Sequence, residues 1–316
     1  MKILANDGIS SSGITALETE GFEVLTTKVA NEQLANFINE KEIAGLLVRS
    51  ATEVRKDVID ACKNLKLIGR GGVGMDNIDV DYAKSKGIHV INTPAASSES
   101  VAELVFAHLY GGVRFLYDAN RNMPLDGDTK FKQLKKSYQK GQELRGRTLG
   151  IIGFGRIGQA TAKIAIGIGM NVIYFDPYLE ECKLELSFFD KQTLSFQLKS
   201  STKEAVLKNS DFITAHVPNQ KDYVIGTKEF AMMRDGVGII NAARGGVIDE
   251  VALIDAIESK KVAFAALDVF ENEPNPEIRI LMHPSISLSP HIGAATEEAQ
   301  DRIGLSLAHQ IIKLLK

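Results

Sequence analysis

The chain has 316 residues, which is enough for two domains that each bury a core. Its residues are 44% hydrophobic and 24% charged, with a formal net charge of −3, so there is no electrostatic case for a nucleic-acid or membrane-surface partner. Two cysteines, Cys62 and Cys182, cannot build a disulfide framework or a multi-thiolate site, and we expect no bound metal. Without a signal peptide or a membrane-spanning stretch, the sequence predicts a soluble cytoplasmic protein.

Strand-like and helix-like segments alternate over the first 97 residues. We expect strands at 3–5, 22–25, 45–48, 67–68 and 88–91, with helices over 13–20, 31–39, 54–61 and 80–86. This alternation is typical of a parallel sheet wound with helices. The glycine-rich loop 69–78 has no suitable helix behind it. It therefore suits either a small anion, held by backbone N–H groups, or a purely structural turn.

Residues 97–120 predict one long helix whose apolar positions cover more than one face. At the junction of two α/β segments, such a helix could cross between domains or bury a subunit interface, and a core-only role stays open. The basic residues near 130–136 are typical of a solvated helix face.

The segment from 148 to 176 carries a dinucleotide fingerprint. A short buried strand at 149–152 runs into Gly153, Gly155 and Gly158, a helix follows over 159–168, and a second strand at 172–175 ends at Asp176. The glycines permit a tight turn, close approach of a pyrophosphate and close packing of helix on strand. Asp176, 23 residues after Gly153, lies where an acid binds the adenine ribose, which favours NAD over NADP.

The alternation continues to the end of the chain. Strands are expected at 211–215, 236–240, 262–267 and 286–288, and helices over 202–208, 227–233 and 250–259. A final helix, 296–315, is long enough to return to the first domain. The sequence thus predicts two doubly wound α/β domains, in which ligands bind outside the carboxyl ends of the strands.

Three of these strand ends carry groups suited to alcohol oxidation. Arg244, Glu273 and His291 each follow a different strand of the second domain. A histidine takes up the hydroxyl proton as hydride leaves, a carboxylate bonded to the ring favours the imidazolium, and an arginine binds a substrate carboxylate. Each residue alone could equally be an ordinary loop residue; together, after a dinucleotide fingerprint, they indicate catalysis.

Four separated motifs, at 153–158, 241–249, 266–274 and 289–294, resemble the signatures of the D-isomer-specific 2-hydroxyacid dehydrogenases. The resemblance implies that Arg244, Glu273 and His291 form the catalytic set and that the chain forms a homodimer. It also implies a Rossmann NAD-binding domain, residues 98–289, inserted in a flavodoxin-like substrate domain made of 1–97 plus 290–316.

The resemblance further implies which residues bind NAD and the substrate. The NAD contacts would come from Gly153, Gly155, Arg156, Ile157, Gly158, Asp176, His216, Val217, Pro218, Ala242, Ala243, Asp268, Gly293 and Ala294. The substrate contacts would come from Arg49, Ser50, Val73, Gly74, Arg244 and His291.

The segments 48–52, 69–79 and 290–300 most resemble those of family members that oxidise a phosphorylated 2-hydroxy acid, 3-phosphoglycerate. Arg49 would then hold the phosphate, and the amides near Val73 and Gly74 would hold the carboxylate together with Arg244. Lys135, Lys136 or Tyr138 could add phosphate contacts.

Three features depart from the family pattern. Residues 217–222 differ from the usual loop, Val73 stands where relatives often have threonine, and the sequence ends at Lys316 without the regulatory extension of longer members. Other 2-oxo acids, such as glyoxylate or hydroxypyruvate, remain alternative substrates. A related NAD-sensing corepressor, which binds partner peptides, is the alternative from another functional class.

Overall fold

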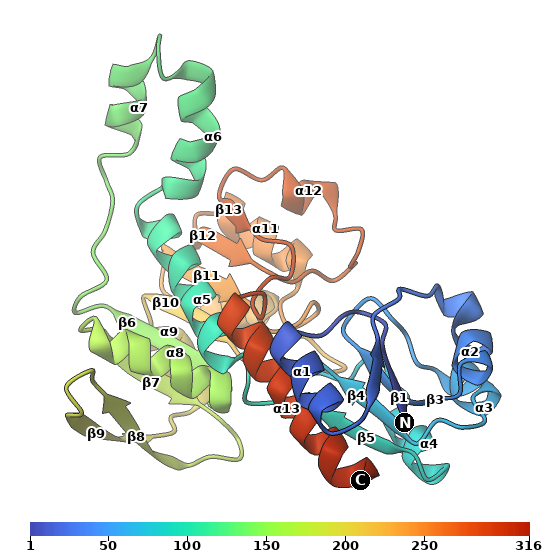
Figure 1. Ribbon diagram of the computed structural model, residues 1–316. Helices are drawn as coiled ribbons and strands as arrows, with labels where there is room; N and C mark the ends of the chain where they lie inside the picture. The colour runs from blue at the N-terminus through green and yellow to red at the C-terminus, as the bar shows by residue number, and fades with distance from the viewer. The chain divides into compact units, whose positions relative to one another are not determined.

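The computed structural model describes residues 1–316, which divide into two compact units (Figure 1). Unit 1 comprises Met1–Ser100 and Ala294–Lys316, and unit 2 comprises Val101–Gly293. Each unit has its own parallel sheet covered by helices, so the predicted α/β fold class is confirmed. None of the helices combines the length and the apolar character that a bilayer crossing needs.

Unit 1 contains a five-stranded parallel sheet in the order β2-β1-β3-β4-β5. The strands are β1 (Lys2–Ala5), β2 (Glu23–Leu25), β3 (Ile43–Val48), β4 (Leu67–Arg70) and β5 (His89–Asn92). This is the flavodoxin-like strand order, whose ligand-binding switch point lies between β1 and β3. The loops that follow these two strands are therefore where unit 1 is expected to bind a ligand.

Helices cover both faces of this sheet. On one face pack α2 (Asn31–Glu40), α3 (Lys56–Ala61) and α4 (Val80–Ser85), and on the other pack α1 (Ser11–Thr19) and α13 (Glu297–Leu315). The last two meet at paired glycines, since a Cβ on Gly13 would lie 2.9 Å from the Gly304 backbone. The predicted return of the C-terminal helix to the first domain is thus observed, and it depends on residues without side chains at the crossing.

Unit 2 contains a six-stranded parallel sheet in the order β13-β12-β11-β10-β6-β7. The strands are β6 (Thr148–Ile152), β7 (Asn171–Phe175), β10 (Phe212–Ala215), β11 (Val237–Asn241), β12 (Val262–Leu267) and β13 (Ile286–Leu288). The central strands β10 and β11 are buried along their whole length, as expected for a sheet covered on both faces.

The helices of unit 2 also divide between the two faces of its sheet. On one face lie α5 (Ser98–Val113) and α8 (Arg156–Gly167), and on the other lie α9 (Lys203–Asn209), α10 (Thr227–Met232), α11 (Glu250–Glu258) and α12 (Ile278–Leu281). Every strand predicted from the apolar runs is present, within two residues at each end.

The predicted single helix over 97–120 is wrong. Helix α5 ends at Val113, Phe115 adopts a left-handed conformation with φ 54°, and a separate helix α6 (Leu116–Asp126) follows. The Val113 carbonyl, which a continuing helix would use, instead accepts a hydrogen bond of 2.9 Å from the N–H of Gln142. Helix α5 therefore ends where the segment around Gln142 returns to it. No local sequence pattern near Val113 predicts this contact.

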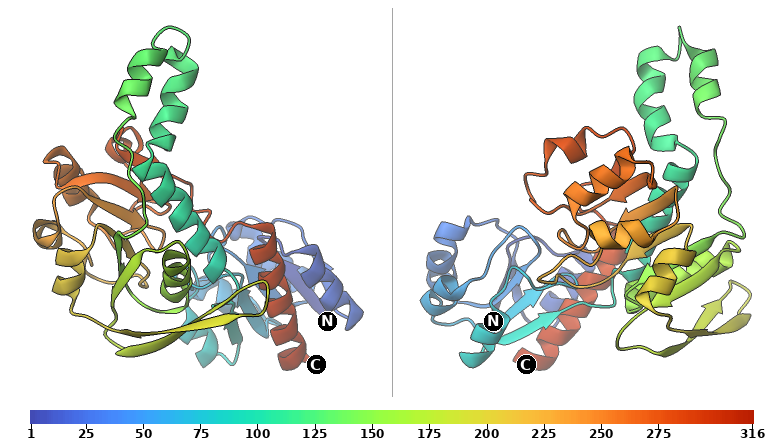
Figure 2. Two further views of the ribbon diagram at one scale, coloured as in Figure 1. Left: turned by 90° about the vertical axis from the view of Figure 1, so that its left-hand side faces the viewer. Right: turned by 180° about the vertical axis from the view of Figure 1, so that it is seen from behind.

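Helices α6 and α7 (Phe131–Ser137) form an arm that extends away from the sheet of unit 2, as both further views show (Figure 2). Neither helix contains a single buried residue. The exposed apolar residues of the arm include Leu116, Met123, Leu125 and Phe131. Two helices this short are marginal in water without tertiary packing, so the arm lacks the packing that normally stabilises such helices.

An antiparallel hairpin, β8 (Glu181–Ser187) and β9 (Thr193–Lys199), was not predicted. Leu184 and Leu186 are buried, whereas the residues between them are exposed, so β8 alternates as a half-buried strand does. This period-2 pattern was the available sequence signal, and it lies where the chain runs from β7 to α9. The hairpin packs against the α8 side of the unit 2 core.

Candidate active site

The glycine turn after β6 has the geometry of a phosphate-binding loop. Gly153 adopts φ +89°, and a Cβ there would lie 2.6 Å from the carbonyl oxygen of His216. A Cβ on Gly158 would lie 2.3 Å from the Gly153 oxygen, whereas the position above Gly155 is open. The turn therefore closes tightly on β10 and leaves free space at the N-terminus of α8. There, the first N–H groups of the helix lack intrahelical partners and can bind a pyrophosphate.

Asp176, at the end of β7, is anchored beside this turn. Its Oδ2 accepts a 2.7 Å hydrogen bond from the Phe154 N–H, and its Oδ1 accepts bonds from the N–H groups of Tyr178 and Leu179 at 2.8 and 3.1 Å. These contacts fix the carboxylate next to the open space above Gly155. The residues present thus fit a dinucleotide, with an acid in place for ribose hydroxyl groups.

His216 follows β10 and lies directly behind the glycine turn, where its N–H donates to Ile152 at 2.8 Å. Burial lowers the pKa of His216 to about 3, so its imidazole is neutral at any ordinary pH. Its Nε2 lies 3.3 and 3.2 Å from the hydroxyl groups of Thr161 and Thr214, but Nδ1 is buried without a partner. Of the next two residues, Val217 is half-buried and Pro218 is exposed.

Glu273 and His291 form a hydrogen-bonded pair of 2.8 Å between Oε2 and Nδ1. They follow β12 and β13, and Oε1 of Glu273 also accepts from the Phe270 N–H at 3.0 Å. Burial by itself raises the pKa of Glu273. The hydrogen bonds from His291 and Phe270, together with the charges of His291 and Arg244, outweigh that effect and lower the pKa below its usual value. The carboxylate thus stays ionised and orients the ring, so that Nε2 is the nitrogen available to a substrate.

The backbone of His291 is held in an uncommon conformation, with φ 55°. Its N–H donates to the carbonyl oxygen of Asp268 at 2.8 Å. The Asp268 side chain is buried and accepts the N–H groups of Ile292 at 2.8 Å and Gly293 at 2.9 Å. One aspartate at the end of β12 therefore fixes the loop that carries the histidine.

Arg244 is brought close to this pair by a glycine. A Cβ on Gly245 would lie 1.8 Å from the carbonyl oxygen of Phe270, so only glycine allows the loop after β11 to reach the loop after β12. The Asn241 side chain donates to the Arg244 carbonyl at 3.0 Å and closes the turn. Between them, Ala242 and Ala243 are buried. Unit 2 thus gathers Arg244, Glu273 and His291, together with Asp268, at the carboxyl ends of its strands.

A reciprocal pair of glutamates, Glu250 and Glu271, supports the loop before Glu273. The Glu271 N–H donates to a Glu250 oxygen at 2.9 Å, and the Glu250 N–H donates to a Glu271 oxygen at 3.0 Å. Burial raises the pKa of Glu250. The sequence offered no signal for this support, because glutamates at a helix start are ordinary.

Unit 1 carries the candidate substrate residues at the carboxyl ends of β3 and β4. Asp7 fixes the first loop by accepting the N–H groups of Arg49 and Thr52 at 2.7 and 3.1 Å. The Asn77 amide donates to the carbonyls of the same two residues at 2.7 and 2.6 Å. Burial lowers the pKa of Arg49, and the charge of Asp7 opposes that effect. The arginine is thus a half-buried cation in a rigid loop, which suits an anion.

The remaining predicted residues of unit 1 are open to a ligand to different degrees. Ser50 and Val73 are exposed, and Gly74 is half-buried. The Val73 carbonyl accepts from the Asn92 amide at 2.7 Å, so this part of the glycine loop is anchored. Ala294 also belongs to unit 1, where its carbonyl accepts from the Gln300 side chain.

The suggested phosphate role of Lys135, Lys136 and Tyr138 gains no support within unit 2. The two lysines lie on α7 in the arm, and the Tyr138 hydroxyl donates to Asp118. Tyr138 also lines a hollow with Gly236 and Ser285, which lie just before β11 and β13. That hollow is at the amino ends of the strands, opposite the edge that carries Arg244 and His291.

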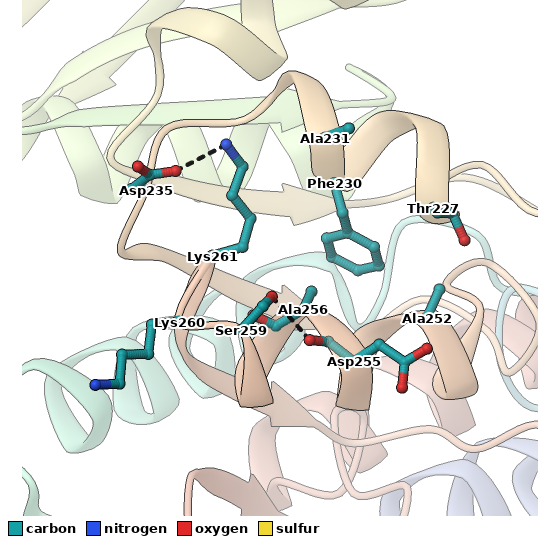
Figure 3. A pocket seen from close by; sticks show the side chains of 10 residues that line it. All are labelled: Thr227, Phe230, Ala231, Asp235, Ala252, Asp255, Ala256, Ser259, Lys260 and Lys261. Atoms are coloured by element: carbon teal, nitrogen blue, oxygen red, sulfur yellow. Dashed lines mark hydrogen bonds and ion pairs between the residues drawn. The ribbon is translucent and has the colours of Figure 1, made fainter.

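One hollow in unit 2 is not the site of the chemistry. It measures about 710 Å³ and lies between α10 and α11, where Phe230 and Ala256 line it (Figure 3). Asp235 and Lys261, which form an ion pair of 2.9 Å at its rim, directly precede β11 and β12. The hollow therefore opens at the amino-terminal edge of the sheet, away from the strand ends that carry Arg244, Glu273 and His291.

A dinucleotide turn and an arginine–glutamate–histidine set on parallel α/β sheets define an NAD-dependent oxidoreductase. Comparison with known proteins agrees. Residues 106–293 match the family model described as D-isomer specific 2-hydroxyacid dehydrogenase, NAD binding domain. The chain belongs to the D-isomer specific 2-hydroxyacid dehydrogenases, and its cofactor is NAD.

Individual relatives differ in their named substrates. The chain is 42% identical to a hydroxypyruvate reductase of Thermotoga maritima, over 99% of this chain and 98% of the relative. It is 41% identical to a D-3-phosphoglycerate dehydrogenase of Methanocaldococcus jannaschii, over 100% of this chain but only 58% of that longer protein. A crystal structure of 3-phosphoglycerate dehydrogenase from Entamoeba histolytica with bound NAD⁺ superimposes with a TM-score of 0.77 at 26% identity. That match covers 100% of this chain and 95% of the other.

Proposed function

We propose that the protein oxidises D-3-phosphoglycerate to 3-phosphohydroxypyruvate, the entry reaction of serine biosynthesis. The observation that carries this proposal is Arg49, a half-buried cation fixed by Asp7 in the loop after β3, at the switch point of unit 1. Relatives named D-3-phosphoglycerate dehydrogenase, 41, 39 and 37% identical over the whole of this chain, support the assignment.

The proposed roles follow from the chemistry of each group. Unit 1 is the substrate domain and unit 2 the NAD-binding domain. Arg244 binds the substrate carboxylate, together with the amides of Val73 and Gly74, and Arg49 binds the phosphate. His291 takes the C2 hydroxyl proton, and the Glu273 carboxylate stabilises the imidazolium that forms. NAD held at the glycine turn would supply the acceptor for the C2 hydride, so that the alcohol loses one hydride and one proton.

A second candidate is reduction of hydroxypyruvate or glyoxylate. The observation that favours it is the 42% identity to a hydroxypyruvate reductase that the chain matches over almost its full length. The two candidates share the catalytic set and differ only in whether a phosphate is recognised.

Turnover of matched substrates separates the candidates. NADH oxidation is measured with 3-phosphohydroxypyruvate, hydroxypyruvate, glyoxylate and 2-oxoglutarate. The first two differ only by the phosphate. We expect a preference in kcat/KM of about 100-fold for the phosphorylated acid, equivalent to about 2.7 kcal/mol of transition-state binding. The variant Arg49→Met is expected to remove most of this preference and to leave the rate with hydroxypyruvate almost unchanged.

Each other result has a definite meaning. Equal or reversed efficiency with hydroxypyruvate would contradict the phosphoglycerate assignment and favour the reductase. If Arg49→Met slowed both acids equally, its proposed phosphate contact would be wrong. No turnover with any of the four acids would favour the NAD-sensing role instead.

We also propose that the protein is a homodimer through the arm formed by α6 and α7. Leu125 and Phe131 are 76 and 57% exposed, and no residue of either helix is buried, so the arm needs a partner surface. The variant Leu125→Asp is expected to sediment as a monomer when the wild type sediments as a dimer. Ile278→Asp, at a 74% exposed isoleucine on α12, is the control and should stay dimeric. A dimeric Leu125→Asp variant would place the interface elsewhere.

A further inference from the structure

His108 is a buried histidine on α5 whose two ring nitrogens are both hydrogen-bonded. The residue is 7% exposed and lies next to Leu109, on the side of α5 that packs into the apolar core. Its Nδ1 lies 2.9 Å from the Ser287 hydroxyl, and its Nε2 lies 2.8 Å from the Ser289 hydroxyl. Ser287 lies in β13. Ser289 directly follows this strand, two positions before His291.

The direction of the hydrogen bonds between His108, Ser289 and Asp268 follows from the Asp268 carboxylate. The Ser289 hydroxyl donates to Asp268 Oδ1 at 2.7 Å, and the same carboxylate already accepts the N–H groups of Ile292 and Gly293. Because Ser289 uses its only proton on Asp268, its oxygen must accept the Nε2–H of His108. In the neutral ring, Nδ1 carries no proton and accepts the hydroxyl of Ser287.

The hydrogen bonds thus place a proton on Nε2, and burial of the ring favours its neutral form. Burial lowers the pKa of His108, although the charge of Asp268 opposes this effect, so the neutral form agrees with the surroundings of the ring. All four side chains of the network, which are His108, Ser287, Ser289 and Asp268, thereby have hydrogen-bond partners. A fully satisfied buried network is rigid, because any rearrangement leaves a polar group without a partner.

The network ends on the backbone that holds His291. Asp268 accepts from Ile292 and Gly293 on one side of the histidine, and its carbonyl accepts the His291 N–H. His291 itself is held in a left-handed conformation that few residues adopt readily, so its backbone needs such external support. His108 is the only member of the network that connects this loop to helix α5.

We propose that His108 is a positioning residue for the dehydrogenase reaction: as a fixed Nε2–H donor, it orients Ser289 and Asp268 and thereby the loop that presents His291 to the substrate. This role rests on the proposed function of His291 as the proton acceptor. It needs no proton transfer by His108 itself, which touches neither the substrate nor the reacting atoms.

The test compares His108→Leu with His108→Gln. Leucine fills the space but offers no donor, whereas a glutamine amide can still donate to Ser289 and cannot take up a proton. We expect His108→Leu to lower kcat about 10-fold, the scale of one lost buried hydrogen bond. The KM of the oxo acid and the dissociation constant of NADH should change less than about two-fold. We expect His108→Gln to recover most of kcat with the pH profile of the wild type.

Val105→Ala is the matched control for a purely structural effect, because Val105 is fully buried on the same helix and its side chain has no hydrogen-bonding group. It should lower the thermal unfolding midpoint without lowering kcat. The positioning role would be overturned if the two variants, Val105→Ala and His108→Leu, lost the same amount of thermal stability and also the same fraction of kcat. A shifted pH profile in His108→Gln would also overturn it, since His108 would then act by titrating.

A parallel assay of His291→Ala separates failure of this proposal from failure of the proposed function. If His291→Ala is inactive while His108→Leu retains wild-type kcat, only the role of His108 is wrong. If His291→Ala retains wild-type kcat, the proposed catalytic function of the loop is wrong, and the role of His108 fails with it.

Discussion

Replacing His291 by alanine is expected to lower kcat by roughly 10²–10⁴-fold, the contribution of a positioned general acid–base group. His291 follows β13 and is oriented by Glu273 through a 2.8 Å hydrogen bond, so its removal takes away the proton acceptor and leaves the fold intact. The dinucleotide turn belongs to other strands. NADH affinity, measured by fluorescence titration, should therefore stay within about two-fold of the wild type.

His309→Ala is the control for this experiment, because His309 is an exposed histidine on α13 and is not among the predicted site residues. It should retain full activity. A His291→Ala enzyme within a few-fold of the wild type would rule out the proton-acceptor role. A loss of NADH affinity as large as the loss of kcat would mean that the loop serves cofactor binding instead.

Replacing Asp176 by alanine is expected to reduce the preference for NAD over NADP by about 10- to 100-fold in kcat/KM. The carboxylate lies beside the open space above Gly155, where it can accept ribose hydroxyl groups and repel a 2′-phosphate. Asp176→Asn keeps an acceptor oxygen but removes the charge, so it should relax the discrimination against NADP while weakening NAD less.

Asp190→Ala, in the exposed turn between β8 and β9, changes the same residue type outside the site and should leave the cofactor preference unaltered. Steady-state kinetics with both cofactors measures the ratio directly. If Asp176→Ala and the wild type had the same ratio of kcat/KM for NAD to kcat/KM for NADP, another residue would have to recognise the adenine ribose.

Local sequence was informative wherever a single segment determines its own structure. The apolar runs at β10 and β11 are short, continuous and bounded by polar residues, which is the signature of a strand buried on both faces. The fingerprint at Gly153, Gly155 and Gly158 was readable because each glycine meets a steric demand within one turn. Arg244, Glu273 and His291 could be nominated because each lies in the loop that follows a strand.

Local sequence failed where distant residues decide. The end of α5 at Val113 depends on Gln142, which returns from the arm to bond the carbonyl that the helix would have used. The hairpin β8–β9 was missed although Leu184 and Leu186 alternate, because its strands were sought only as members of a parallel sheet. The supports of the site, His108 and Asp7, act through partners 179 and 42 residues away along the chain.

The sequence by itself determined the two α/β sheets, the dinucleotide turn and the chemistry available at the strand ends, because hydrophobic periodicity and steric requirements are local. Only the tertiary structure decided how the side chains at these strand ends are positioned relative to one another. The contact between Glu273 and His291, the close approach at Gly245 and the buried network from Ser287 to Asp268 each join separate strand ends. Such contacts depend on strand order and loop conformation, which no segment specifies alone.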